Sequence, residues 1–105
     1  MVTKEIAIKE IKDFAIQCKL NGLTFSKIFF FGSTLHSKAN ENSDIDVLLF
    51  SDQFTNNIFE NTKLYAKPLW KFYNLDVKAY PTAMYEFGNL LIDEVKKNGL
   101  EIKID

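Results

Sequence analysis

The chain has 105 residues, 47% of them hydrophobic, and its 13 basic and 14 acidic residues leave a net charge of −1. This length suits one domain with a sizeable core, so residues 1–105 are predicted to form a single domain. Without a block of basic residues, the sequence argues against an extended nucleic-acid surface. No apolar run approaches the roughly 20 residues that cross a membrane.

Two further features indicate a cytoplasmic protein. Cys18 is the single cysteine, so no disulfide can form within the chain, and no cysteine and histidine cluster has zinc-site spacing. The first residues, Met-Val-Thr-Lys-Glu-Ile, lack the apolar core of a signal peptide. A reducing compartment is therefore expected.

The amino-terminal half is predicted to form one helix and two strands. Thr3 can cap a helix that Asn21-Gly22 ends. The apolar residues of this helix recur at helical spacing: Ala7, Ile8, Ile11, Phe14, Ala15 and Cys18. Two apolar runs, Lys27 to Phe31 and Asp44 to Phe50, are predicted to be strands.

The carboxyl-terminal half continues this alternation. A helix within Asn56 to Lys67 is expected to end by Pro68, and a strand from Leu75 to Tyr80 follows. A last helix, Thr82 to Lys97, aligns four apolar side chains: Met84, Phe87, Leu91 and Val95. Leu100 to Ile104 alternates as a final strand at a sheet edge. This order predicts an α/β (α+β) fold, a small mixed β-sheet with helices packed against it.

The aromatic content is high for so small a chain, with ten phenylalanines, four tyrosines and one tryptophan. Trp70, Phe72 and Tyr73 are assigned to the core or to an interface rather than to stacking on a nucleobase. Apolar surface that a small domain leaves uncovered indicates association, either as a dimer or in a complex.

The most specific pattern joins the first two strands: Gly32-Ser33, ten residues, and then Asp44 and Asp46 around an isoleucine. Residues two apart on a strand share a face, so the two aspartates project together. The residues that alternate behind them are apolar: Ile45, Val47 and Leu49. Adjacent carboxylates suit magnesium, which takes one or two protein carboxylates, several waters and substrate phosphates.

The Gly-Ser half of the pattern suits a phosphate. Gly32 lets the backbone turn tightly and bring its N–H groups close to an anion, and Ser33 adds a hydroxyl donor. Either half alone is common in proteins. A strand, Gly-Ser, a spacer and a second strand that opens with Asp-x-Asp together indicate a nucleotide-and-magnesium site.

With these motifs, the chain resembles the minimal nucleotidyltransferases, the MNT type of the polymerase-beta-like nucleotidyltransferase superfamily. The resemblance covers nearly the whole chain, from the first helix to the strand Leu75 to Tyr80. It implies the polymerase-beta-like nucleotidyltransferase fold and a third carboxylate on that strand, where Asp76 is the position that fits. Lys78 and Tyr80 alternate onto the same face as Asp76, where they either line the cleft or lie at a solvated strand end.

The resemblance also implies an activity and a partner. Members of the family transfer a nucleotidyl group, usually AMP from ATP, to a hydroxyl, and some modify a tyrosine of a HEPN-type toxin as its antitoxin. For this chain it implies AMPylation catalysed by Asp44, Asp46 and Asp76, which would hold two Mg²⁺ ions, with Gly32 and Ser33 binding the ATP phosphates. The acceptor hydroxyl is expected on a HEPN-type helical partner or on a second subunit of a homo-oligomer.

Two departures from the family pattern Gly-Ser-x-Ala-Arg-Gly bear on the activity. His36 stands where an arginine is usual, and Ser37 stands where a glycine is usual. Histidine is mostly neutral at pH 7, so Lys38 is the neighbour that can supply positive charge to the phosphates. The changes leave the three carboxylates untouched.

Two other functions stay open. The chain would be a non-catalytic binding module that neutralises its partner by contact if the changes at His36 and Ser37 had abolished turnover. A free-standing nucleotidyltransferase acting on a small molecule is the weaker alternative, because the sequence has no substrate-binding domain.

Overall fold

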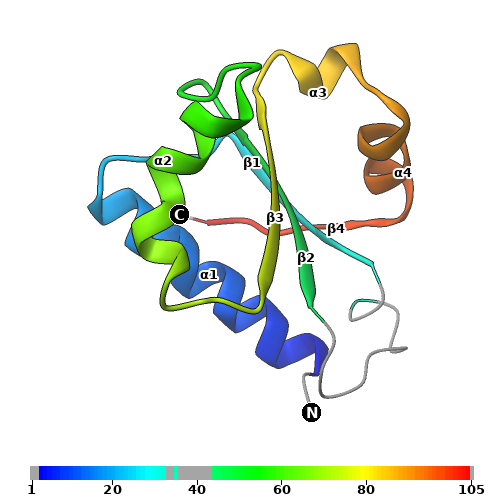
Figure 1. The fold of residues 1–105 in the computed structure, drawn as a ribbon. Coiled ribbons are helices and arrows are strands. Elements are labelled where there is room, and N and C mark those ends of the chain that lie inside the picture. Colours follow the sequence, from blue (N-terminus) through cyan, green and yellow to red (C-terminus); the bar gives the residue numbers. More distant parts are fainter. Residues whose placement is uncertain (1–2, 33–34, 36–43, 105) are drawn as a thin grey trace.

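A four-stranded sheet with the strand order β3-β2-β1-β4 organises the protein (Figure 1). The structure is a computed structural model, and it describes residues 3–32, 35 and 44–104. The elements in chain order are α1 (Lys4–Leu20), β1 (Lys27–Phe31), β2 (Ile45–Ser51), α2 (Ile58–Leu69), β3 (Leu75–Pro81), α3 (Met84–Phe87), α4 (Leu90–Asn98) and β4 (Leu100–Glu101). None of the helices in these ranges is long and apolar enough to span a bilayer.

The sheet is mixed, as the sequence predicts. Strand β1 pairs antiparallel with both β2 and β4, whereas β2 and β3 run parallel. A parallel pair needs a crossover, and α2 supplies it between β2 and β3. The predicted fold class is therefore confirmed.

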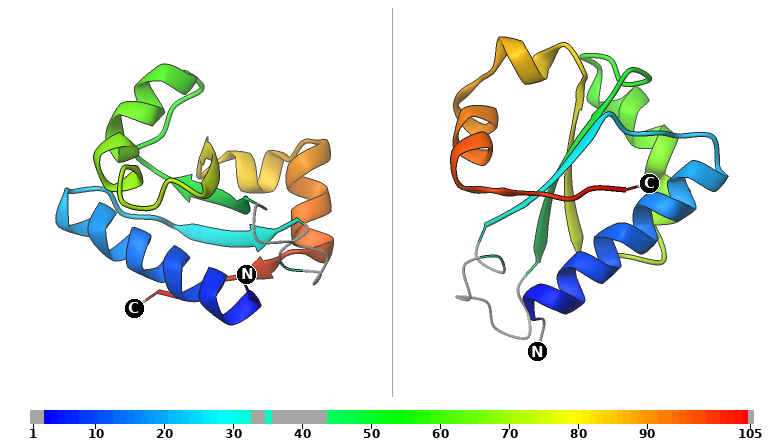
Figure 2. Two further views of the ribbon diagram at one scale, coloured as in Figure 1. Left: turned by 60° about the horizontal axis from the view of Figure 1, so that its bottom comes forward. Right: turned by 180° about the vertical axis from the view of Figure 1, so that it is seen from behind.

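Helices cover both faces of the sheet. Figure 2 shows α1 and α2 on one side of the strands and α3 and α4 on the other. Side chains of β2 alternate between the two sides: Ile45, Val47 and Leu49 pack with α1 and α2, and Leu48 and Phe50 pack with α4. All five are fully buried, so the predicted burial behind the aspartates is confirmed, and a second buried face adds to it.

Helix α1 follows its sequence signals closely. The Thr3 hydroxyl oxygen accepts a hydrogen bond from the Ile6 N–H at 3.1 Å, which is the expected N-cap. The helix ends before Asn21, and its buried stripe comprises Ala7, Ile11, Phe14, Ala15 and Cys18. Local capping and helical periodicity are sufficient to position this helix on the sheet.

The buried thiol on this stripe should be inert. Cys18 is fully buried, and burial raises the pKa of its thiol to about 12 because the thiolate cannot be hydrated. We expect native protein to resist iodoacetamide at pH 8 and to react stoichiometrically after unfolding in guanidinium, as followed by mass spectrometry. Modification of the native protein at the rate of a free thiol would contradict this packing.

The predicted end of α2 is wrong by about half a turn. The helix runs through Pro68 to Leu69 instead of stopping before the proline. Proline at this position removes one hydrogen bond, to the carbonyl of Leu64, and the next turn continues because the Trp70 N–H donates to the Ala66 carbonyl at 3.3 Å. Pro68 is buried, so packing offsets a loss that is small near a helix end.

The predicted helix from Thr82 to Lys97 is in fact two helices, α3 and α4. Gly88 lies between them with φ +79°, a left-handed conformation that ends α3. Asn89 then caps α4, accepting a hydrogen bond from the Ile92 N–H at 2.7 Å. Phe87, assigned to the apolar face of one long helix, is consequently 86% exposed.

The final strand lies at an edge, as predicted, but it is shorter than expected. Only Leu100–Glu101 pairs with β1, and the Ile102 N–H donates to the Ile28 carbonyl at 2.8 Å. In this antiparallel register, residue 103 lies opposite the first residue of β1. Ile104, the last residue of the predicted strand, therefore lies beyond the end of β1.

Candidate active site

Two of the predicted carboxylates meet across the parallel strands. Asp46, the second residue of β2, lies opposite Asp76, the second residue of β3. On the other side of β2, Asp46 lies opposite Phe31, the last residue of β1, which Gly32 follows. Three strands thus bring residues far apart in the sequence to one end of the sheet.

Asp44 lies directly before β2, so this strand begins one residue later than predicted. Asp44 is exposed, whereas Asp46 and Asp76 are partly buried. The charge of Asp44 nevertheless reaches Asp46, because it contributes to raising the pKa of that carboxyl. The structure therefore places all three predicted aspartates in one electrostatic neighbourhood, with Asp46 in its middle.

Asp46 is the member of the group whose ionisation its surroundings oppose. Its pKa is raised above the ordinary value, first by burial and then by the negative charge of Asp76 and a side-chain hydrogen bond with it. Asp44 adds repulsion, and the Lys78 ammonium acts in the opposite direction.

Lys78 belongs to this neighbourhood. Its Nζ lies 3.3 Å from Oδ1 of Asp76, and both side chains are about half exposed, at 50% and 46%. The period of two along β3 accounts for this pairing, and the exposed Lys78 side chain contacts one of the predicted carboxylates. Tyr80, one step further along, instead packs on Phe50 with ring centroids 6.2 Å apart.

Gly32 is held against the carboxylate of Asp46. Its φ is +85°, and a Cβ at this position would collide with the Asp46 side chain, lying 2.9 Å from its Cγ. A glycine is therefore needed here both for the left-handed backbone and for the close approach. The other predicted loop residues, Ser33, His36, Ser37 and Lys38, lie outside the described residues.

The donor chemistry fits a hard divalent cation. Within residues 3–32, 35 and 44–104, no group of three or more acidic, histidine or cysteine side chains is arranged to hold one ion. Magnesium does not need three, because one or two carboxylates suffice when waters and phosphates complete its shell. Asp46 and Asp76 form such a pair, and a bound cation would relieve the repulsion between them.

Repulsion between Asp46 and its acidic neighbours should lower the free energy of unfolding of the parent protein. An acid whose pKa is raised on folding binds its proton more tightly in the folded chain, so ionisation above that pKa lowers stability. Asp46→Asn should therefore raise Tm by a few degrees at neutral pH without metal, since opposed like charges cost up to about 1 kcal/mol. The advantage should vanish as pH falls below the ordinary value of 3.8.

The control for this measurement is Asp52→Asn, because Asp52 is an exposed aspartate in the turn after β2. It should leave Tm unchanged across the same pH series, recorded by circular dichroism in EDTA. An Asp46→Asn protein no more stable than its parent at neutral pH would contradict the repulsive arrangement.

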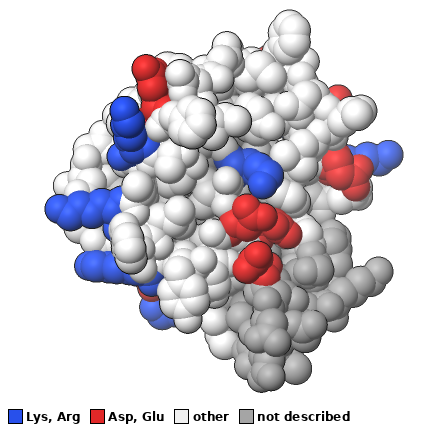
Figure 3. Space-filling view, in the orientation of Figure 1, with Lys and Arg blue, Asp and Glu red and all other residues white. Residues whose placement is uncertain are grey.

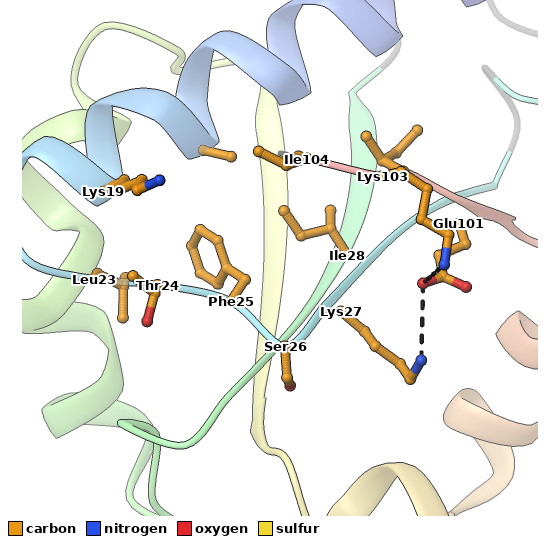
Figure 4. Close-up of a pocket in the computed structure, with 12 residues that line it drawn as sticks. Lys19, Leu23, Thr24, Phe25, Ser26, Lys27, Ile28, Glu101, Lys103 and Ile104 are labelled. Carbon is orange, nitrogen blue, oxygen red and sulfur yellow. Dashed lines mark hydrogen bonds and ion pairs between the residues drawn. The ribbon is translucent and has the colours of Figure 1, made fainter.

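A separate cavity of about 250 Å³ lies away from these aspartates (Figure 4). It is bounded by the end of α1, the beginning of β1 and the segment from Glu101 to Ile104. Glu101 at its rim contacts two lysines, Lys27 at 3.8 Å and Lys103 at 3.0 Å. Because Asp46 lies opposite the far end of β1, this cavity is not part of the carboxylate site.

The carboxylates reach the surface of the molecule. In Figure 3, acidic side chains gather near the middle of the face shown, with a basic side chain beside them. An open acidic surface with one cation at its edge can hold metal-bound phosphates. A substrate on another macromolecule can also approach it.

The chain was compared with known proteins by sequence and by fold. No curated protein matches the sequence significantly. A Sulfolobus solfataricus crystal structure, whose assignment as a nucleotidyltransferase is itself provisional, superposes with a TM-score of 0.66 at 16% identity, over 90% of this chain and 78% of that one. A toxin–antitoxin structure with AMP-PNP gives 0.61 at 20% identity, over 93% and 73%.

The toxin–antitoxin MntA-HepT structure gives a TM-score of 0.55 at 17% identity, over 97% of this chain and 74% of that one. At such identities these structures establish a shared fold. The sequence pattern of the nucleotidyltransferase domain, in contrast, matches residues 8–104, nearly the full length. The chain therefore belongs to the nucleotidyltransferase domain family.

Proposed function

We propose that this protein is a magnesium-dependent adenylyltransferase that transfers AMP from ATP to a hydroxyl on a HEPN-type helical toxin, as the antitoxin of the pair. The observation that carries the proposal is the pairing of Asp46 with Asp76 beside Gly32, in a chain that belongs to the nucleotidyltransferase domain family. This pairing supports the proposal because it brings two carboxylates and a glycine turn to one end of the sheet.

Each residue has a distinct role in the proposed reaction. Asp44, Asp46 and Asp76 would hold two magnesium ions, which when bound supply positive charge to the attacking and leaving oxygens. Gly32 leaves room for the triphosphate, and Ser33 donates a hydrogen bond to its outer phosphates.

The transfer itself is an in-line displacement at the α-phosphate. The acceptor oxygen forms a bond to phosphorus as the bond to pyrophosphate breaks, and pyrophosphate leaves with the bonding electrons. Asp76 takes the proton of the acceptor hydroxyl as a general base. Lys78, 3.3 Å from Asp76, keeps that carboxylate oriented before substrates bind.

The partner part of the proposal draws on two observations. The chain shares its fold with proteins solved as toxin–antitoxin complexes, one named MntA-HepT and one containing AMP-PNP. Its carboxylates also lie partly exposed at the end of a sheet, where a hydroxyl on another protein can reach them.

The experiment that tests this function uses α-labelled ATP. Purified protein is incubated with the label, magnesium and lysate of its host, and the labelled molecule is identified. We expect label on a small helical protein, and none with EDTA or with the Asp44→Asn/Asp46→Asn variant. Label that appears on no molecule, or only on a small metabolite, would contradict the proposal.

One observation favours the non-catalytic alternative. The Lys78 Nζ lies 3.3 Å from Oδ1 of Asp76, so this carboxylate has a cationic partner without metal. A binding module would silence its toxin in EDTA and without ATP. The enzyme requires both magnesium and ATP, and a toxin-activity assay with and without them separates the two functions.

A further inference from the structure

Helix α2 has a second apolar face that nothing in the described part of the chain covers. Its first face packs on the sheet through Asn61, Tyr65 and Pro68. On the opposite side and just beyond the helix, Phe59, Trp70 and Tyr73 are 81%, 83% and 88% exposed. We call these three aromatic residues, together with the groove that Trp70 and Tyr73 help to line, the α2 stripe.

The groove has a volume of about 330 Å³, and its lining is Thr62, Ala66, Leu69, Trp70 and Tyr73. Small side chains at Thr62 and Ala66 separate the large aromatic ones, which leaves a depression along the helix. A depression between side chains three and four apart accepts the ridge of another helix. Scattered surface hydrophobics need no explanation, but a grooved row of them indicates a binding site.

A row of unpaired positive charge borders the α2 stripe. Lys63 and Lys67 are exposed and four apart, so they share one side of α2. Lys71, four residues further on in the turn after the helix, is exposed as well. None of the three makes an ion pair with a described residue, whereas Lys78 and Lys103, for example, each contact an acid. Basic side chains line the side of the molecule on which α2 lies, as Figure 3 shows.

The α2 stripe leads to the carboxylates. Tyr73 lies in the short connection between α2 and β3, three residues before Asp76. Any molecule held on the stripe is therefore delivered beside the acidic end of the sheet. The apolar groove, the row of lysines and the closeness to Asp76 all indicate one kind of binding partner.

We infer that the α2 stripe is the docking surface for the acceptor protein, and that it binds a helix with an apolar ridge and a row of acidic side chains. The inference rests on the proposed function in that it takes the occupant to be the molecule that receives AMP. The acidic row is required because the lysines lie along one flank of the groove and lack partners in the described part of the chain. Apolar burial supplies affinity and the charges set orientation.

A second copy of this chain fits the surface less well. In an antiparallel pair of α2 helices related by a twofold axis, the lysine rows of both copies would lie on the same side and repel. An anionic membrane would satisfy the charges, but it has no ridge to fill the groove. These two occupants are outcomes that the test distinguishes.

Trp70 makes the test direct, because it is the single tryptophan in the sequence and belongs to the stripe. Its emission should be red and readily quenched by acrylamide in the isolated protein, and it should shift to the blue when the stripe is covered. The probe is a helical peptide of about three heptads with leucines at a and d and glutamates along both flanks. Its counterpart carries lysines in place of the glutamates.

We expect the glutamate peptide to bind at least about tenfold more tightly than the lysine peptide, a difference of about 1.4 kcal/mol. Both affinities are read from the blue shift and the reduced quenching of Trp70. Lys63→Glu/Lys67→Glu/Lys71→Glu should reverse this preference. Phe59→Ser/Tyr73→Ser, which keeps the tryptophan, should weaken both peptides. The matched controls, Lys12→Glu/Lys97→Glu and Phe87→Ser/Leu90→Ser, alter equally exposed residues on other elements and should change nothing.

Three results would overturn the inference. One is an equal response to both peptides, or none. The second is a blue shift with phosphatidylserine vesicles but not with the glutamate peptide. The third is a shift that depends on protein concentration alone, with a dimer in light scattering.

Failure of the docking surface and failure of the proposed function give different results. Asp44→Asn/Asp46→Asn should bind the glutamate peptide like the parent, because those residues are not in the α2 stripe. If the glutamate peptide binds while the parent protein transfers no AMP, the α2 stripe is supported as a binding surface and the proposed function is contradicted. If transfer to a protein proceeds unchanged after the lysine reversal, the function stands and the stripe is not its docking surface.

Discussion

Asp76→Asn should lower AMP transfer by about 100-fold or more, the scale of a lost general base, while most magnesium-dependent ATP binding is retained. The asparagine keeps the shape of the side chain beside Asp46 but cannot accept the proton of the attacking hydroxyl. Binding falls little because Asp44 and Asp46 remain. Transfer is measured by label incorporation at saturating ATP, and binding by calorimetry.

His36→Ala is the comparison variant for this experiment, because a mostly neutral imidazole contributes little charge. Its effect on transfer should be smaller than that of Asp76→Asn. Transfer that survives Asp76→Asn unchanged would mean that the third carboxylate has been misassigned. The catalytic role would then fall to Asp44 and Asp46 alone.

Replacing both Asp44 and Asp46 with asparagine should abolish magnesium-dependent ATP binding and leave the fold intact. The reason is that Asp46 lies at the centre of the carboxylate group, between Asp76 on β3 and Gly32 after β1. Removing two of three mutually repelling charges should also raise Tm without metal, in the same direction as the single Asp46 substitution.

Calorimetric titration of ATP with and without magnesium measures this loss, and circular dichroism checks the fold. Asp13→Asn is a suitable control, since Asp13 forms a surface ion pair with Lys9 on α1, at 2.8 Å. This variant should bind ATP like the parent. Equal ATP affinity in the double variant and the parent would exclude these aspartates as the metal ligands.

Local sequence was sufficient wherever a single element determines the outcome. The Thr3 cap, the buried stripe of α1, and strand β1 follow from capping and periodicity within a few residues. The same short-range rules failed at Pro68 and at Gly88-Asn89. In the first case buried packing outweighed one lost hydrogen bond, and in the second a glycine and a capping residue interrupted a periodic pattern.

A candidate site could also be proposed from the sequence, because Asp-x-Asp on a strand and a preceding Gly-Ser are local patterns. The sequence names Asp44, Asp46 and Asp76 as candidates through spacing and resemblance. It does not contain the register of β2 against β3, which sets Asp46 directly opposite Asp76. A shift of one residue would turn one carboxylate to the opposite face.

Only the tertiary structure decided which groups act on one another. The raised pKa of Asp46, the Lys78 contact with Asp76 and the need for glycine at position 32 all depend on three strands meeting at one end of the sheet. The same is true of Trp70 and Tyr73, which the sequence leaves between core and interface. Phe72 is partly buried and packs against Phe14, whereas Trp70 and Tyr73 are exposed, because the turn after α2 brings only one of these three side chains to the core.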